Sequence, residues 1–347
     1  MDHSWLQQPG RKTIGVIALE ASACALRERE VPYYYFSHAL FHPASGDYRR
    51  YVGHRTTWRL IREAHVLNPL LKNKLLLEAL LREAGVPGPP ATLLSVRNGH
   101  YYDHTTSREL AKISVEDLRG RIHAALASCK GVFVKRTSAQ AGSDAVLIRQ
   151  DLTGLGLNSS SVTSIECIED LHNRLATGEW IIAPQVEQHT DLARVYPVSV
   201  NTLRLVTWKK SHTRIEVIAA LMRFGDLGSV TDNRKSGGLC VPVEIEGGAL
   251  KGHGFKNSRF RPMVHDRHPH TLERFLGLRC PGFDEARRVC QSAHHLIDNP
   301  IVGWDVAICP ESVRILEGNG NPDVTLTQLA IGGLRSSSAS EAYARWL

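Results

Sequence analysis

Several patterns that mark common protein classes are missing from this chain of 347 residues. Its seven cysteines are scattered without a C-x-x-C pair, and the spacing of its histidines matches no zinc site. No apolar run approaches the roughly 18 residues needed to span a membrane, and residues 1–5 do not open a secretory signal. These absences favour a cytoplasmic protein that keeps its thiols reduced.

Motifs for several kinds of catalysis and for nucleic-acid binding are also missing. There is no G-x-x-x-x-G-K-[ST] phosphate loop, and no Ser-His-Asp or Cys-His arrangement. The net charge is +7, but the basic residues are dispersed, without long runs and without interleaved aromatic residues. The charge therefore favours small anionic ligands, such as nucleotide phosphates and carboxylates, over nucleic acid.

The composition, with 42% apolar and 22% charged residues, is typical of a globular protein with two or three lobes. Periodicity predicts a strand running into a helix over residues 13–27, and helices over residues 72–85, 114–129 and 284–298. Strands are predicted at residues 91–96, 131–135, 145–148, 180–183, 199–208, 215–224, 239–245, 303–308 and 314–319. Because few helices separate these strands, an α+β fold is favoured over a doubly wound parallel sheet.

The last two predicted strands carry acid and amide side chains where buried strands usually carry valine or isoleucine. Alternation places Glu317 and Asn319 on one face of the second strand, and Asp305 reaches that face if the strands form a hairpin. Three oxygen ligands on rigid strands suit a hard cation such as Mg²⁺. The alternative is a pair of edge strands whose polar ends are solvated.

Two groups of lysines suit anion binding. Lys135 ends an apolar strand and precedes a small polar loop, residues 136–144, whose backbone N–H groups suit phosphate. The alternative is an ordinary mobile hairpin. Lys72 and Lys74 open an amphipathic helix, where lysine is unfavourable for the helix dipole unless an anion binds between them. Here the alternative is a solvated helix face.

Two further cationic positions lie beside predicted strands. Arg204 stands among apolar strand residues and needs an anionic partner, which is either a ligand or a structural salt bridge. Lys235 belongs to a flexible cationic loop, residues 232–238, that suits either phosphate binding or a solvated turn.

Taken in order, these features resemble the ATP-grasp superfamily, and most closely its sugar-transfer-associated branch, which is similar to tubulin-tyrosine-ligase-like and glutamate-ligase-like proteins. The resemblance covers roughly residues 65–335. Its marks are the Asn-Lys start and Pro-rich exit at 73–90, Phe-Val-Lys at 133–135, Ser-Val-Asn-Thr-Leu-Arg at 199–204, His-Pro-His-Thr at 268–271 with Cys-Pro at 280–281, Gly-Trp-Asp at 303–305, Leu-Glu-Gly-Asn at 316–319, and Pro-Asp at 322–323 followed by Gln328.

The resemblance implies two α+β lobes that sandwich ATP, with a small leading lobe. The implied division is residues 1–65, 66–184 and 185–347. The implied ATP-binding residues are Lys74 and Lys135 on the phosphates, Ser138, Gly142 and Ser143 in the closing loop, and Gln185, Val186 and Glu187 in the adenine-binding hinge. The implied Mg²⁺ ligands are Asp305, Glu317 and Asn319, and the implied catalytic residues are Arg204 and Lys235.

Two positions depart from the family pattern. The hinge reads Ala183-Pro184-Gln185 where an acidic residue is common, so we expect the adenine contact to shift toward Glu187. Gly303 stands where many peptide-forming relatives carry arginine, so an oxyanion-stabilising arginine must come from elsewhere. Arg204 is the candidate for that role.

The resemblance implies an ATP-dependent carboxylate–amine ligase that forms an amide bond through an acyl phosphate, in natural-product or polysaccharide biosynthesis. Two alternatives remain: a kinase-like phosphotransferase on the same fold, and a non-catalytic nucleotide-binding module. The expected partners are small carboxylates and amines, without nucleic acid or membrane, and the chain acts either alone or as a homodimer.

Overall fold

The structure is a computed structural model that describes residues 4–64, 66, 68–138, 145–151, 154–159, 167–233, 237–258, 261–335, 338–344 and 347. The first part of the chain forms η1 (Ser4–Gln7), α1 (Ile14–Glu28), α2 (Tyr33–Ser37), η2 (Pro43–Ser45), η3 (Tyr48–Arg50), α3 (His54–Glu63), α4 (Pro69–Lys72) and α5 (Lys74–Glu83). The middle part forms β1 (Leu94–Arg97), β2 (His100–Asp103), β3 (Arg108–Leu110), α6 (Val115–Leu126), β4 (Val132–Arg136), β5 (Val146–Asp151), β6 (Gly154–Ser159), α7 (Ile168–Leu175) and β7 (Glu179–Pro184). The last part forms α8 (Thr190–Val195), β8 (Thr202–Lys209), β9 (Ile215–Phe224), β10 (Leu239–Pro242), β11 (Gly254–Ser258), β12 (Arg261–His265), α9 (Phe283–His295), β13 (Ile301–Ile308), β14 (Val313–Asn319), α10 (Val324–Ile331) and α11 (Ser338–Tyr343).

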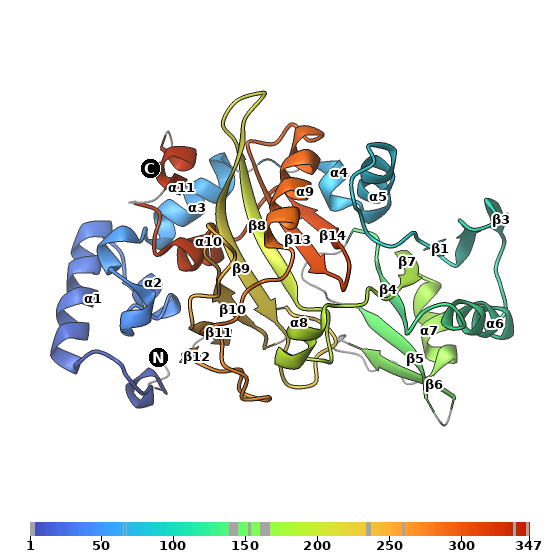
Figure 1. The fold of residues 1–347 in the computed structure, drawn as a ribbon, viewed down its shortest axis with the longest axis horizontal. Coiled ribbons are helices and arrows are strands. Elements are labelled where there is room, and N and C mark those ends of the chain that lie inside the picture. Colours follow the sequence, from blue (N-terminus) through green and yellow to red (C-terminus); the bar gives the residue numbers. More distant parts are fainter. Residues whose placement is uncertain are drawn as a thin grey trace.

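Within these described residues, the strands form two seven-stranded sheets. The N-terminal sheet has the order β3-β2-β1-β7-β4-β5-β6, and the C-terminal sheet has the order β12-β11-β10-β9-β8-β13-β14. The neighbouring strands pair antiparallel in both sheets. Figure 1 shows the two sheets side by side, with helices packed on each. The predicted α+β fold is therefore confirmed.

The prediction for residues 13–27 was wrong in its first half, because this segment is helical from Ile14 onward. Thr13 caps the helix by accepting a hydrogen bond from the backbone N–H of Val16 at 3.5 Å. The apolar run is rich in alanine, which favours helix, and only Ile17 and Cys24 of α1 are buried. A short apolar run alone does not distinguish a strand from a helix.

Helix α5 joins the two sheets at the point where Lys74 lies. The side chain of Asn73 caps the helix by accepting from the N–H groups of Leu75 and Leu76, at 3.0 and 3.2 Å. Leu77 and Leu81 pack in the core of the C-terminal sheet. The backbone N–H of Lys74 itself donates to the carbonyl of Thr137, just after β4, at 3.0 Å. These contacts hold Lys74 between the sheets.

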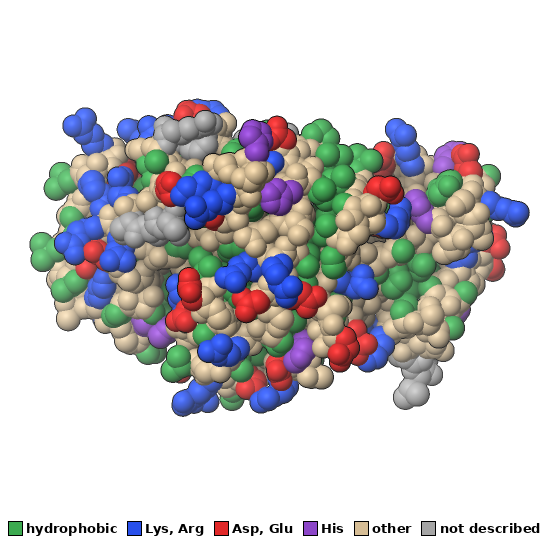
Figure 2. Space-filling model, turned by 45° about the horizontal axis from the view of Figure 1, so that its top comes forward, with side chains coloured by type: hydrophobic (Ala, Val, Ile, Leu, Met, Phe, Trp, Pro, Cys, Tyr) green, Lys and Arg blue, Asp and Glu red, His purple; other side chains and the backbone are tan. Residues whose placement is uncertain are grey.

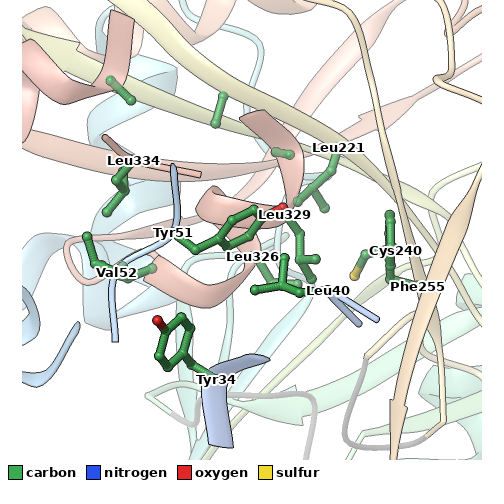
Figure 3. Close-up of a cluster of buried hydrophobic side chains, with 14 of the residues drawn as sticks. Tyr34, Leu40, Tyr51, Val52, Leu221, Cys240, Phe255, Leu326, Leu329 and Leu334 are labelled. Carbon is green, nitrogen blue, oxygen red and sulfur yellow. The ribbon is translucent and has the colours of Figure 1, made fainter. Parts of the chain in front are cut away.

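The described residues form three hydrophobic cores. One lies between the N-terminal sheet and helices α6 and α7, and a second between the C-terminal sheet and helices α5, α8 and α9. The third joins the other face of the C-terminal sheet to the N-terminal helices and α10. Figure 3 shows this third core, where Tyr34, Tyr51 and Val52 lie beside Leu326 and Leu329.

A buried amide reinforces the attachment of the N-terminal segment. Gln328 of α10 is fully buried, and its Oε1 accepts from the backbone N–H of Val52 at 2.8 Å. Its Nε2 lies 3.4 Å from the carbonyl oxygen of Val52 and 3.4 Å from Nε2 of His38. The leading residues are thus bound to the end of the chain by packing and by hydrogen bonds.

The sheets correspond closely to the predicted lobes. The N-terminal sheet ends with β7 at Pro184, and the C-terminal sheet begins with β8 at Thr202. Helix α5, however, lies in the core of the C-terminal sheet although the predicted division assigns it to the preceding lobe. The division into 1–65, 66–184 and 185–347 stays a prediction. Among the described residues, no helix is long and apolar enough to cross a membrane.

Candidate functional site

A cavity with a volume of about 390 Å³ is lined by residues of both sheets. Lys74 and Lys135 line it from α5 and β4. Gln185 and Val186 line it from the segment that follows β7. Arg204, Asp305, Glu317 and Asn319 line it from the C-terminal sheet. The structure thus gathers eight of the predicted site residues around one cavity.

The acidic residues of the predicted hairpin occupy one face of neighbouring strands. β13 and β14 pair antiparallel, with Asp305 opposite Glu317 and Gly303 opposite Asn319. On its other side, Asp305 lies opposite Arg204 of β8. The register shifts after Asp305, which leaves an extra residue in β14 before Glu317. Arg204, Asp305 and Glu317 therefore occupy paired positions on three adjacent strands.

Asp305 is held between two guanidinium groups. Arg204 donates to both carboxylate oxygens of Asp305, and its Nη2 lies 3.0 Å from Oδ2. Nη2 of Arg223 lies 3.0 Å from the same Oδ2. Burial acts to raise the pKa of Asp305, but Arg204 and Arg223 outweigh it and hold the pKa below its usual value. Asp305 is therefore a carboxylate, and both arginines keep their charge.

Arg223 was not among the predicted site residues, although it lines the cavity. Its guanidinium donates to the hydroxyl of Thr202 at 2.8 Å and lies 3.3 Å from Oδ1 of Asp232. Asp232 in turn accepts from the N–H and the hydroxyl of Thr202, and burial raises its pKa while Arg223 lowers it. The sequence did contain a signal, because Arg223 also stands among apolar strand residues, as Arg204 does.

Gly303 explains part of the departure from the family pattern. A Cβ atom at this position would lie 2.9 Å from Cβ of Pro322 and 3.5 Å from Cδ of Arg204. A larger side chain would therefore crowd Pro322, and the arginine side chain nearest to this position is that of Arg204. An Arg204 side chain close to position 303 is compatible with its expected role as the oxyanion-stabilising arginine.

The two lysines of the cavity differ in their partners. Nζ of Lys74 lies 3.3 Å from Oε1 of Glu317. Lys135 is partly buried, and among the described residues its ammonium group makes no ion pair and no hydrogen bond. Burial lowers the pKa of Lys135, Glu317 raises it and the nearby charge of Lys74 lowers it further. A cation without a partner in a cavity is a candidate anion-binding group.

The predicted hinge contributes its first two residues to the cavity. The backbone N–H of Gln185 donates to the carbonyl of Gly131 at 2.7 Å, which ties the segment to the start of β4. Apolar side chains such as Phe133, Ile181 and Leu316 line the same cavity and suit a flat aromatic base. Glu187 lies outside this cavity, is exposed, and pairs with Lys130. The structure therefore does not bring the Glu187 side chain to the other site residues.

The remaining predicted residues lie elsewhere or cannot be placed. Ser138 is exposed and does not line the cavity. Gly142, Ser143 and Lys235 lie outside the described residues. Lys72 lies with Lys74 and Asn319 around a small neighbouring pocket of about 20 Å³.

The donor types of the β13–β14 hairpin fit a hard divalent cation, although in this structure Asp305 pairs with Arg204 and Arg223, and Glu317 pairs with Lys74. Asp305 and Glu317 offer carboxylate oxygens, and Asn319 offers an amide oxygen from the same face. No cluster of three or more His, Cys, Asp and Glu side chains suited to a metal occurs in the described part of the chain. The fit therefore rests on two carboxylates and one amide, which leaves coordination positions for phosphate oxygens and water.

Some solved structures are similar to this chain at low identity. D-alanyl-alanine synthetase A from Vibrio cholerae has 8% identity and a TM-score of 0.41, with 80% of this chain and 64% of that chain covered. The ATP-grasp ligase PsnB, complexed with minimal precursor, Mg and ADP, has 15% identity and a TM-score of 0.38, with 78% and 57% covered. N5-carboxyaminoimidazole ribonucleotide synthetase from Thermotoga maritima has 12% identity and a TM-score of 0.36, with 73% and 42% covered.

The chain spans less than two thirds of the length of each of these structures. At TM-scores below 0.5, they add nothing to the assignment of this chain. No protein with a curated description matches it. The sequence profile of the sugar-transfer associated ATP-grasp family, however, matches residues 58–340, which is most of the chain. The chain therefore belongs to the sugar-transfer associated ATP-grasp family.

Proposed function

We propose that the protein is an ATP-dependent carboxylate–amine ligase that forms an amide bond through an acyl phosphate. Membership of the ATP-grasp family supports ATP as the substrate. The observation that carries the proposal is the cavity, where Lys135 makes no ion pair or hydrogen bond with the described residues and where Arg204 and Arg223 face Asp305. Such a concentration of cations beside hard oxygen ligands suits phosphate transfer to an acid.

In this proposal, ATP lies between the two sheets. The apolar wall formed by Phe133, Ile181 and Leu316 takes the adenine, beside the backbone of Gln185 and Val186. Lys74 and Lys135 neutralise the phosphates, and the loop that contains Ser138, Gly142 and Ser143 closes over them. Asp305, Glu317 and Asn319 would hold Mg²⁺, which supplies positive charge to the phosphate oxygens.

The chemistry then needs no covalent enzyme intermediate. A carboxylate oxygen of the acid attacks the γ-phosphorus, the bond to the β-γ bridging oxygen breaks, and ADP leaves. The nitrogen of an amine attacks the acyl carbon, the bond to the phosphate oxygen breaks, and an amide, inorganic phosphate and a proton result. Arg204 and Arg223, with Lys235, would neutralise the oxyanions of both steps. Each guanidinium keeps a terminal nitrogen, Nη1, that makes no hydrogen bond with the described residues.

The experiment that separates the ligase from the alternatives is an analysis of products. The protein is incubated with ATP, Mg²⁺, mixed acids and mixed amino acids, and ADP release is followed with mass spectrometry of the products. A ligase releases ADP only when acid and amine are both present and yields the mass of an amide. A phosphorylated product formed without amine would identify a phosphotransferase, and nucleotide binding without turnover would identify a binding module.

Glu317→Gln tests the proposed metal ligand. Because glutamine has the size of glutamate, we expect the fold to be retained. The substitution removes the charge that faces Lys74. We expect turnover to fall by at least about a hundred-fold, because an amide is a poorer ligand than a carboxylate. The matched control is Glu216→Gln, outside the cavity. Full activity of Glu317→Gln in the same assay would contradict the assignment.

The other expectations belong to the same proposal. Small carboxylates and amines are the proposed substrates, and a cytoplasmic location follows from the need for ATP and reduced thiols. All seven cysteines are free.

A further inference from the structure

Helix α1 presents an uncharged apolar face to solvent, far from the cavity. Gly15, Leu19, Ser22 and Leu26 are all exposed, with Leu19 at 74% and Leu26 at 80%. Ile14 and Val16 beside them are also exposed. Figure 1 shows α1 at the left end of the molecule, and Figure 2 shows hydrophobic side chains on the surface at that end. A surface helix normally carries charged residues on this side.

The three charged residues of α1 are turned to its flanks, where they serve the monomer. Glu20 accepts from Lys12 at 2.7 Å and from the hydroxyl of Tyr35 at 2.6 Å. Arg27 donates to the hydroxyl of Tyr34 and to the backbone carbonyl of Tyr51, both at 2.9 Å. Glu28 lies 3.0 Å from Arg335. Every charged side chain of α1 thus pairs with a group of the same chain, and the outer face of the helix carries no charge.

The spacing of the outer face matches a helix-pairing seam. Positions 15, 19, 22 and 26 are four, three and four residues apart, which is the a/d pattern of paired helices. The order of sizes along it is small, large, small, large. Reversing the direction of a second, identical helix places Leu26 opposite Gly15 and Leu19 opposite Ser22. Each leucine then faces a small residue, so the face is complementary to itself.

We propose that α1 pairs antiparallel with α1 of a second copy of this chain about a two-fold axis. Such an isologous contact uses the same patch on both copies, which a self-complementary seam satisfies.

The size of the patch sets the strength of the dimer. A helix of 15 residues is about 22 Å long and 10 Å wide. Its outer face therefore supplies well under the roughly 800 Å² per partner of a stable interface. We therefore expect a weak dimer that depends on concentration and does not need nucleotide.

Sedimentation velocity of the full chain, from about 1 to 300 µM, tests the proposal. The wild type should show a monomer–dimer equilibrium in this range. Gly15→Leu is the sharpest variant: a Cβ at Gly15 meets no atom within 4 Å in the monomer, so the fold tolerates the change, but the leucine would collide with Leu26 of the second helix. The dissociation constant should rise at least about ten-fold in Gly15→Leu and in Leu19→Glu.

The control is Leu276→Glu, because Leu276 is 75% exposed and lies outside α1. This variant should dimerise like the wild type. A wild type that stays monomeric over the whole range would overturn the proposal, and so would a dimer that persists in Gly15→Leu. Wild-type binding to phosphatidylglycerol vesicles that Leu19→Glu abolishes, without a dimer, would overturn it in favour of a membrane. None of these results depends on the proposed ligase activity.

Discussion

Lys135 places in the cavity a charge that makes no ion pair and no hydrogen bond with the described residues. Its ammonium group is partly buried, beside the like charge of Lys74, and its pKa is lowered. Keeping an unpaired cation in a cavity costs free energy unless a ligand supplies the opposite charge. We propose that this position trades stability for anion binding.

Lys135→Met should separate the cost of this charge to stability from its contribution to nucleotide binding. Without nucleotide, the variant should melt at a temperature equal to or higher than the wild type, because an unpaired buried charge is removed. With Mg²⁺ and ATP, its melting temperature should rise far less than that of the wild type, because nucleotide affinity falls at least about ten-fold.

Thermal unfolding with and without nucleotide makes this comparison, with exposed Lys112→Met as the control. A Lys135→Met variant that keeps the full nucleotide-dependent shift would show that Lys135 does not bind ATP. A variant that melts well below the wild type without nucleotide would show that the charge is stabilising in the monomer.

The sequence predicted the site residues that stand in recognisable patterns, and missed those whose partners are distant along the chain. Asp305 and Glu317 could be paired because a short turn joins their strands. Arg223 and Asp232 meet Thr202 only after β8 and β9 pair and the following loop folds back. Nothing in the local pattern at Glu187 indicates that its carboxylate turns toward Lys130.

At the scale of secondary-structure elements, helix α9 is fastened to the C-terminal sheet through one buried histidine. Nδ1 of His294 lies 2.7 Å from the hydroxyl oxygen of Thr207, and its Nε2 lies 2.8 Å from the carbonyl oxygen of Asn299. Nε1 of Trp304 also donates to the Thr207 hydroxyl oxygen, at 2.8 Å. The carbonyl requires a proton on Nε2, so neutral His294 accepts on Nδ1 from Thr207.

This network makes stability depend on pH in a definite direction. Burial lowers the pKa of His294 from 6.5 to about 4. Because the folded-state pKa lies below the unfolded one, the unfolded chain binds the extra proton first as the pH falls. The contribution of neutral His294 to the free energy of unfolding is fully present above pH 6.5. It is lost as the pH falls toward 4, by about 3 kcal/mol in total.

Urea unfolding at several pH values between 4 and 7 measures this dependence. The free energy of unfolding of His294→Gln should start lower at pH 7 and should fall less steeply with decreasing pH than that of the wild type. Equal slopes for the two proteins would contradict the assignment, because other buried histidines, such as His268, are present in both.

Secondary structure was predictable where the hydrophobic periodicity of a segment and the capping residues at its ends agree. Ser114 caps α6 in a capping box with Asp117, as its sequence indicates. The short or polar strands β2, β3, β6, β11 and β12, at or next to the sheet edges, were not predicted, because their pairing depends on neighbouring strands and not on an apolar pattern. Helix α1 was partly predicted as a strand, because its exposed apolar residues hide the helical period.

At the scale of the whole molecule, the two sheets bring opposite halves of the proposed chemistry to one cavity. The N-terminal sheet supplies Lys135 and two residues of the apolar wall, Phe133 and Ile181. The C-terminal sheet supplies the acids and the arginines. The proposed phosphoryl transfer uses residues of both sheets, so the central claim concerns a reaction of the two halves together.

The fate of a carboxylate oxygen tests that claim most directly. The protein is given ATP, Mg²⁺, amines and a pool of acids labelled with ¹⁸O in the carboxylate, and the phosphate that is released is analysed by mass spectrometry. An acyl-phosphate ligase transfers one carboxylate oxygen to phosphate, so we predict that each phosphate carries one ¹⁸O atom and that an amide forms with it. Amide formation with unlabelled phosphate, or a phosphorylated product without amide, would contradict the account.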